Sequence, residues 1–95
     1  MALLGSFTKQ TREVLDCDFD YATVLAGRTD TINNKTVEVS PTAQLSIVSS
    51  TIFGNKIKVV VSGGNNNATY KLTVLATSTA GLIYEDEVTV LVEDV

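Results

Sequence analysis

Three aspartates at alternate positions, Asp16, Asp18 and Asp20, form the densest group of potential metal ligands in the sequence. Carboxylates at this spacing begin an EF-hand calcium loop, but that loop also needs further oxygen ligands and a closing Glu. The residues between them are Cys17 and Phe19, which suit a protein interior. In a strand the carboxylates stand on one face, each about 7 Å from the next, which is too far apart to hold one ion unaided. The pattern therefore predicts an exposed strand face.

The other reactive side chains do not assemble a catalytic site. The sequence contains no His, which removes the general base of Ser-His and Cys-His sites and the commonest metal ligand. The single cysteine, Cys17, falls on the apolar side of its predicted strand, so we expect a buried thiol. Residues 62–65 lack the lysine and the following helix of a phosphate-binding loop. We therefore expect a non-enzymatic protein with no catalytic residue, metal or cofactor.

Composition and charge limit the partners of the chain. Its 95 residues are 44% hydrophobic and 19% charged, which fits one folded domain. A formal net charge of −4 argues against a nucleic-acid-binding surface. Both ends are acidic and the middle is mildly basic, which favours solubility and offers a basis for head-to-tail contacts between copies. No signal peptide or membrane segment is visible, so we expect synthesis in a cytoplasm and no contact with a membrane.

Alternation of apolar and polar residues is the dominant pattern along the chain. It predicts strands at residues 13–21, 31–40, 44–51, 56–61, 69–77 and 82–92. Turns are predicted at residues 27–28, 54–55 and 78–81, and an exposed polar loop is predicted at residues 62–67. Six to seven short strands favour an all-β, immunoglobulin-like antiparallel sandwich, with a small Greek-key barrel as the alternative. Tyr70 and Tyr84 are either core aromatics or tyrosines whose hydroxyl reaches a backbone group at a sandwich corner.

The first twelve residues do not share this alternation. We therefore divide the chain into an extended N-terminal arm at residues 1–12 and a β-sandwich domain at residues 13–95. The arm is interpreted either as a frayed terminus or as a segment that becomes ordered on a partner. The candidate protein contacts are Leu3, Leu4, Phe7, Lys9, Gln10 and Arg12 in the arm and Asn65, Asn66 and Asn67 in the loop.

Two parts of the sequence resemble a group of small tailed-phage virion proteins. The first part contains Phe7-Thr8-Lys9-Gln10, Glu13-Val14-Leu15-Asp16, Asp18-Phe19-Asp20-Tyr21, Leu25-Ala26-Gly27 and Asp30-Thr31-Ile32. The second part contains residues 58–64, 70–74, 77–81 and 87–92. The chain departs from the pattern at residues 27–30, where a tighter Gly-Asp turn is expected, and at Val24, where an aromatic residue is expected. Members of this fiber–tail adaptor and head–tail accessory group are single immunoglobulin-like domains.

This resemblance implies a bacteriophage virion structural protein, an adaptor that docks at the head–tail connector or tail and supports tail fibers. The implied partners are connector or adaptor ring proteins, tail or fiber proteins, or the major capsid protein, in many symmetric copies per particle. A capsid decoration (cement) protein is the alternative within this class. A carbohydrate-binding host-attachment module is the alternative from another class, although three Tyr, three Phe and no Trp provide few exposed rings for a sugar.

Overall fold

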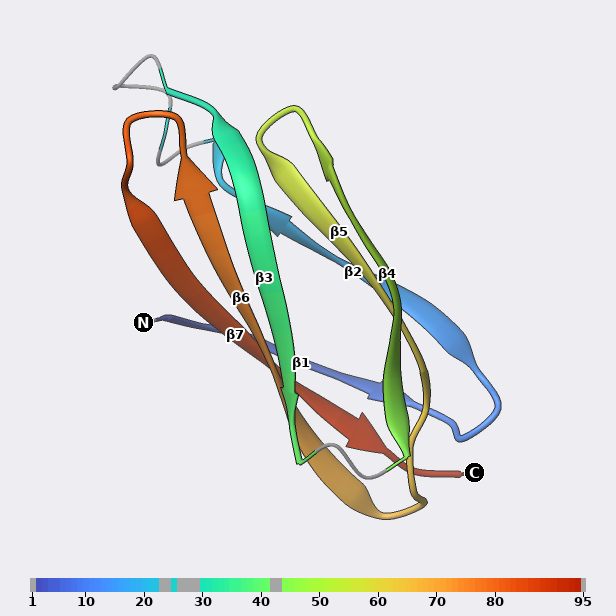
Figure 1. Cartoon of the computed structure of the whole chain (residues 1–95). Coiled ribbons are helices and arrows are strands. Elements are labelled where there is room, and N and C mark those ends of the chain that lie inside the picture. Colours follow the sequence, from blue (N-terminus) through green and yellow to red (C-terminus); the bar gives the residue numbers. More distant parts are fainter. Residues whose placement is uncertain (1, 23–24, 26–29, 42–43, 95) are drawn as a thin grey trace.

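The computed structural model describes residues 2–22, 25, 30–41 and 44–94, with the backbone alone at residues 2–4. Within these residues it contains seven strands, drawn in Figure 1. Their bounds are β1 Ala2–Lys9, β2 Val14–Asp20, β3 Ile32–Ser40, β4 Leu45–Phe53, β5 Lys56–Gly63, β6 Ala68–Ser78 and β7 Ile83–Val92. No helix in the described part of the chain is long and apolar enough to cross a membrane.

The strands form two sheets that pack face to face. One sheet has the order β1-β7-β6-β3 and the other the order β2-β5-β4. The β1–β7 pair is parallel, and every other pair is antiparallel. The molecule is elongated, with extents of 44 × 21 × 19 Å, because the strands of both sheets run near its long axis (Figure 1). This arrangement confirms the predicted all-β immunoglobulin-like sandwich.

The hydrophobic core lies between the two sheets and follows from the alternation in the sequence. Ile57, Val59 and Val61 on β5 are fully buried, while Lys56, the first residue of that strand, is exposed. Across the interior, every second residue of β6 is also buried, from Tyr70 to Ser78. Since successive strand side chains point to opposite faces, this phase places one apolar row from each sheet in the core.

Strand β1 lies before the expected domain boundary at residue 13. Ala2–Lys9 pairs with β7 along its whole length and so forms part of the sandwich. Two features hide this strand in the sequence. A register shift between Leu3 and Gly5 interrupts the alternation, and Gly5 adopts φ 138°, which favours glycine. Lys9 then occupies an inward position that apolar residues usually take.

The turns are confirmed where the structure describes them. Gly54 takes φ 60° in the predicted turn between β4 and β5. The predicted loop at residues 62–67 is shorter than expected, since β5 continues to Gly63. The turn predicted at residues 27–28 and the departure at Val24 lie outside the described residues.

The two late tyrosines have different environments. The Tyr70 hydroxyl accepts a hydrogen bond from the backbone N–H of Asn65 at 2.9 Å, which confirms the corner interpretation for this residue. The Tyr84 ring lies beside the ring of Tyr21, with 6.1 Å between centroids. The Tyr84 hydroxyl is buried and has no hydrogen-bond partner among the residues that the structure describes. Tyr70 therefore fixes the β5–β6 loop, whereas Tyr84 acts as a core aromatic.

Candidate functional site

Most of the predicted contact residues meet at one end of the sandwich, which we call the tip. The tip consists of residues 10–13 between β1 and β2, residues 64–67 between β5 and β6, and residues 93–94 after β7 (Figure 1). These three segments are distant in the sequence. The parallel β1–β7 pair brings the first and third together, since Lys9 pairs with Val92.

Lys9 holds the base of the tip together. Its side chain is fully buried, and its Nζ donates hydrogen bonds to the carbonyl oxygens of Gly63, at 2.6 Å, and Gln10, at 2.7 Å. Burial lowers the pKa of the Lys9 ammonium, while the nearby carboxylates of Glu13 and Asp94 act in the opposite direction. Lys9 thus connects β1 in one sheet with β5 in the other. In the free chain Lys9 therefore lies inside the sandwich, beneath the exposed residues of the tip.

Asp94 joins all three segments of the tip through hydrogen bonds. Its carboxylate accepts a hydrogen bond from the Thr11 N–H at 2.9 Å and another from the Thr11 hydroxyl at 3.0 Å. Its own N–H donates to Asn66 Oδ1 at 2.9 Å. The neighbouring N–H of Glu93 donates to the Lys9 carbonyl at 2.9 Å. Local sequence patterns do not predict the contact between Asp94 and Thr11, because it depends on the order of the strands in the sheet.

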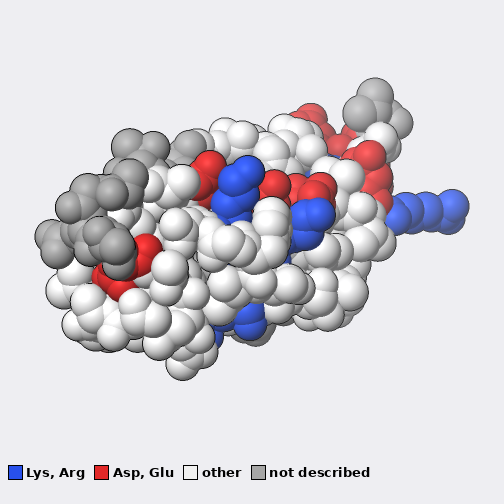
Figure 2. All heavy atoms as spheres, turned by 90° about the horizontal axis from the view of Figure 1, so that it is seen from above, with Lys and Arg blue, Asp and Glu red and all other residues white. Residues whose placement is uncertain are grey.

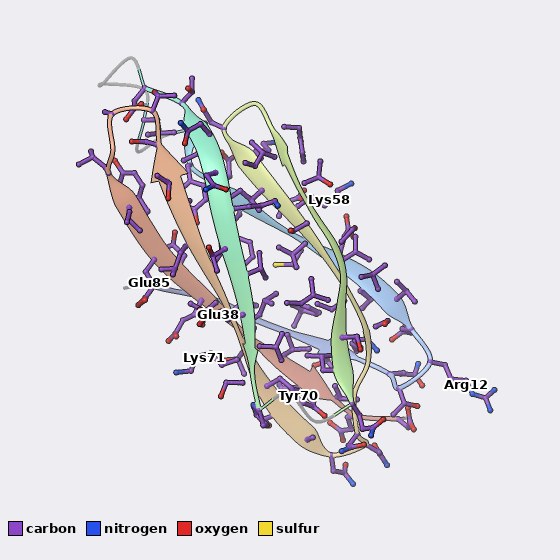
Figure 3. All side chains as sticks on the ribbon, in the orientation of Figure 1. Arg12, Glu38, Lys58, Tyr70, Lys71 and Glu85 are labelled. Atoms are coloured by element: carbon purple, nitrogen blue, oxygen red, sulfur yellow. The ribbon has the colours of Figure 1, made fainter. Side chains whose placement is uncertain are left out.

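The remaining tip residues present polar side chains to solvent. Gln10, Arg12, Asn65, Asn66 and Asn67 are all exposed. Arg12 points away from the β1–β2 turn, as Figure 3 shows, and forms no ion pair with any described residue. On the face seen in Figure 2, basic and acidic side chains are interspersed. The tip is therefore a polar surface of amides, the Arg12 guanidinium and the exposed carboxylates of Glu13, Glu93 and Asp94, held on an internally hydrogen-bonded frame.

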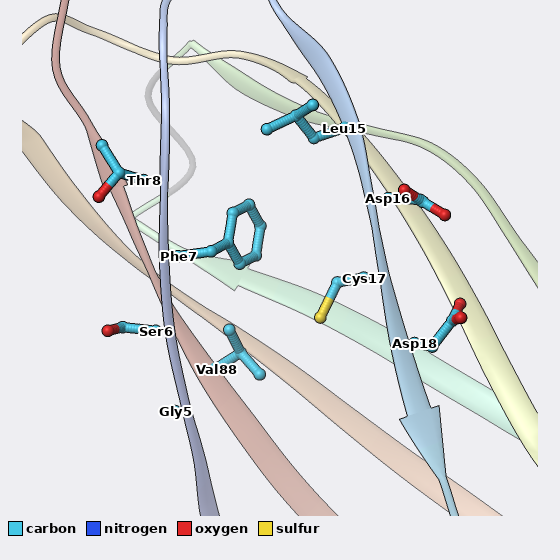
Figure 4. Close-up of a pocket in the computed structure, with 9 residues that line it drawn as sticks. All are labelled: Gly5, Ser6, Phe7, Thr8, Leu15, Asp16, Cys17, Asp18 and Val88. Carbon is cyan, nitrogen blue, oxygen red and sulfur yellow. The ribbon is translucent and has the colours of Figure 1, made fainter.

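The apolar residues of the predicted arm lie away from the tip. Phe7 is half-buried and points into a groove between β1 and β2 (Figure 4). Leu3 pairs through its backbone with Glu87 on β7, and Leu4 lies at the register shift that follows. The predicted contact set is thus divided between the tip and strand β1.

Strand β2 carries the three aspartates on its exposed face, as expected. Asp16 forms an ion pair with Lys58 on the neighbouring strand, with Oδ2 and Nζ 3.6 Å apart. No three His, Cys, Asp or Glu side chains among residues with a described position group as a metal site. Cys17 is half-buried rather than buried and lines the same groove as Phe7. Burial raises the pKa of the Cys17 thiol, and the charges of Asp18 and Asp16 raise it further.

A second polar cluster, centred on Asp30, lies at the opposite end of the sandwich. Asp30 is only 7% exposed, and its Oδ1 accepts hydrogen bonds from the Thr79 hydroxyl at 2.5 Å and the Thr31 N–H at 2.9 Å. Hydrogen bonds from the Thr79 and Ser78 hydroxyls lower the pKa of Asp30 to about 2. The cluster joins the start of β3 to the β6–β7 turn, so its role is structural. The sequence gives no signal for it beyond an acidic residue beside a strand.

Comparison with known protein families matches residues 9–91 to the family described as podophage GP4 fiber-tail adaptor protein gp77. The chain belongs to this family. The match extends from the last residue of β1 nearly to the end of β7, and so covers most of the sandwich. This adaptor is a non-enzymatic structural component of the phage virion and binds other virion proteins. The prediction of a fiber–tail adaptor is thereby confirmed. No curated protein matches the chain.

Proposed function

We propose that the adaptor docks through its tip onto a protein of the head–tail connector or tail, in many symmetric copies per particle. The observation that supports this proposal is the convergence of Arg12 with Asn65, Asn66 and Asn67 on one end of the sandwich. These residues come from two separate loops, and their side chains face solvent. A surface assembled from separate loops on a rigid β-scaffold is a common way to present binding residues.

The hydrogen-bonded frame beneath these side chains holds the tip in place, so that docking would lose little conformational entropy. Lys9 connects the two sheets below the tip, and the Asp94 carboxylate connects the β1–β2 turn to the C-terminal segment. The Tyr70 hydroxyl fixes the β5–β6 loop at Asn65. Because binding loses affinity when loops must be immobilised, a tip ordered in advance favours association.

The chemistry of the tip indicates a polar partner surface with a carboxylate placed to meet Arg12, since the other exposed charges of the tip, on Glu13, Glu93 and Asp94, are acidic. The Arg12 guanidinium has donors that match a carboxylate in a bidentate geometry. The amides of Asn65, Asn66 and Asn67 supply both donors and acceptors. A few such contacts are weak in one copy, but symmetric repetition around a tail adds them together and gives firm attachment.

Charge reversal at the tip tests this proposal in a phage that lacks the gene and is supplied with variants during growth. We expect Arg12→Glu to reduce the adaptor content of purified virions at least tenfold, since it removes the exposed cation of the tip and places a carboxylate opposite the carboxylate that Arg12 would bind. Lys56→Glu is the matched control, because Lys56 is exposed at the β4–β5 turn, away from the tip, and changes charge identically. Normal adaptor content with a correctly folded Arg12→Glu variant would contradict docking through the tip.

A further inference from the structure

The sandwich is closed along one side and open along the other. On the closed side, the edge strands β3 and β4 pack against each other. On the open side, β1 and β2 diverge and leave a groove of about 440 Å³ between the sheets. The residues that line it include Phe7, Leu15, Cys17 and Val88, with Asp16 and Asp18 at the rim.

The floor of this groove is apolar and incompletely covered. Figure 4 shows Phe7 and Val88 facing Leu15 and Cys17 across the space between the strands. Phe7, Leu15 and Cys17 are each only half-buried, although they occupy the inward phase of their strands. Similar inward positions on β5 are fully buried. The core is therefore less completely packed between β1 and β2, and additional apolar side chains from a partner would complete its packing.

The two sides of the groove are sheet edges. Among the described strands, β1 pairs only with β7, and β2 pairs only with β5. Part of the backbone N–H and C=O groups of each edge therefore points away from its own sheet. The β1 side carries the small residues Gly5, Ser6 and Thr8, so the backbone is accessible there. An extended strand has the geometry and the backbone groups to continue such an edge.

The charges at the rim of the groove indicate what kind of strand it would bind. Asp16 and Asp18 are exposed at the β2 rim, and no Lys or Arg lines the described part of the groove. Asp16 shares an exposed ion pair with Lys58, whereas Asp18 has no ion pair within the described residues. The effect of both carboxylates on the Cys17 thiol shows that their field extends into the groove. A basic side chain beside Asp18 would balance this charge.

A second copy of the chain fits these requirements poorly. Of its described edge strands, β2 is acidic and β4 contains no charged residue. The lysine of β1 is Lys9, which is buried. Strand β3 offers Lys35, but this edge strand packs against β4. A strand from a different protein therefore matches the rim better.

We propose that the β1–β2 groove binds an extended strand of another virion protein, one with apolar side chains at alternate positions facing the groove and a Lys or Arg beside Asp18. The strand would add to a sheet edge and place its apolar residues on Phe7, Leu15 and Cys17. The groove is a second surface, separate from the tip, and its occupancy does not depend on which partner the tip contacts.

Photocrosslinking in the intact virion tests the occupant directly. Thr8 lies at the β1 edge of the groove with its side chain on the outer face of that strand, beside the position of a strand added to this edge (Figure 4). It is replaced by p-benzoylphenylalanine in the full-length adaptor during phage growth. Purified virions are irradiated, and crosslinked peptides are identified by mass spectrometry. We expect crosslinks to one segment of another virion protein that alternates apolar residues and contains Lys or Arg. Crosslinks to a second adaptor copy, or none from virions with normal adaptor content, would overturn the proposal.

Charge reversal at the rim gives an independent test. We expect Asp18→Lys to reduce the crosslink from position 8 at least tenfold. Asp20→Lys is the matched control, because Asp20 is exposed on the same face of β2 but does not line the groove. An unchanged crosslink in a folded Asp18→Lys variant would refute the role of charge. The Arg12→Glu variant separates the two surfaces: if it is incorporated normally while Asp18→Lys loses the crosslink, tip docking is wrong and the groove proposal stands.

Discussion

The two tyrosines near the end of the chain allow a matched test of hydrogen bonding in this sandwich. Replacing Tyr70 by Phe removes the hydroxyl that accepts the Asn65 N–H at 2.9 Å. Tyr70 is only 1% exposed, so water does not replace the hydroxyl at the ring, whereas the N–H belongs to an exposed residue. The expected loss is therefore at least that of one ordinary hydrogen bond, about 1 kcal/mol of unfolding free energy.

The same substitution at Tyr84 should not lower the stability of the sandwich. Its hydroxyl is buried with no partner among the described residues, so removing it takes an unsatisfied polar group out of the interior. We expect Tyr84→Phe to leave the unfolding free energy unchanged or to raise it by up to about 1 kcal/mol. The ring, which packs beside Tyr21, is retained in this variant.

Thermal unfolding followed by circular dichroism or calorimetry measures both variants. With an unfolding entropy of about 2 cal/mol/K per residue, a chain of 95 residues changes its midpoint by roughly 5 °C per kcal/mol. Tyr70→Phe should therefore unfold roughly 5 °C below the wild type, and Tyr84→Phe at or above it. Equal midpoints for the two variants, or a lower one for Tyr84→Phe, would refute the assignment of hydroxyl partners.

Three further predictions concern the glycine at the end of β5, the buried carboxylate of Asp30 and the hydrophobic core. Gly63→Ala should cost at least about 2 kcal/mol in urea unfolding, because φ is 78° and the new Cβ collides with the Gln44 carbonyl. Asp30 has a pKa of about 2 in the folded chain against an ordinary 3.8, so its contribution is complete above pH 3.8 and is lost toward pH 2. Unfolding midpoints of Asp30→Asn should consequently fall less between these values than those of the wild type; parallel curves would contradict the assignment. Val59→Ala, at a fully buried site, should cost about 2–3 kcal/mol by denaturant titration, and a cost below about 1 kcal/mol would indicate a loosely packed core.

The sandwich itself was predictable because its strands show a clear alternation. On β5, Ile57, Val59 and Val61 alternate with polar or half-exposed neighbours, and the core uses this phase. Strand β1 was not predictable in the same way. Its register shift precedes Gly5, and an inward lysine stands where a core residue is expected. A lysine is acceptable there only because carbonyl oxygens of Gly63 and Gln10 surround its ammonium, which is a tertiary property.

The candidate surfaces were predictable in part. The exposed asparagines follow from a loop without apolar residues, and the structure places Asn65, Asn66 and Asn67 in solvent. The contact between Thr11 and Asp94 depends on the pairing of β1 with β7. These two strands lie at opposite ends of the sequence, so no local pattern predicts the contact. The groove depends on the divergence of two sheets, which local periodicity does not encode.

The parallel pairing of β1 with β7 also has a mechanical consequence for an adaptor that connects two parts of a particle. The first and last strands run side by side in the same direction, from the Ala2–Asp86 pair to the Lys9–Val92 pair (Figure 1). Tension between the start of β1 and the end of β7 is therefore directed along both strands. It loads the hydrogen bonds between them in shear, all at once, whereas a terminal hairpin pulled from its ends opens one bond at a time.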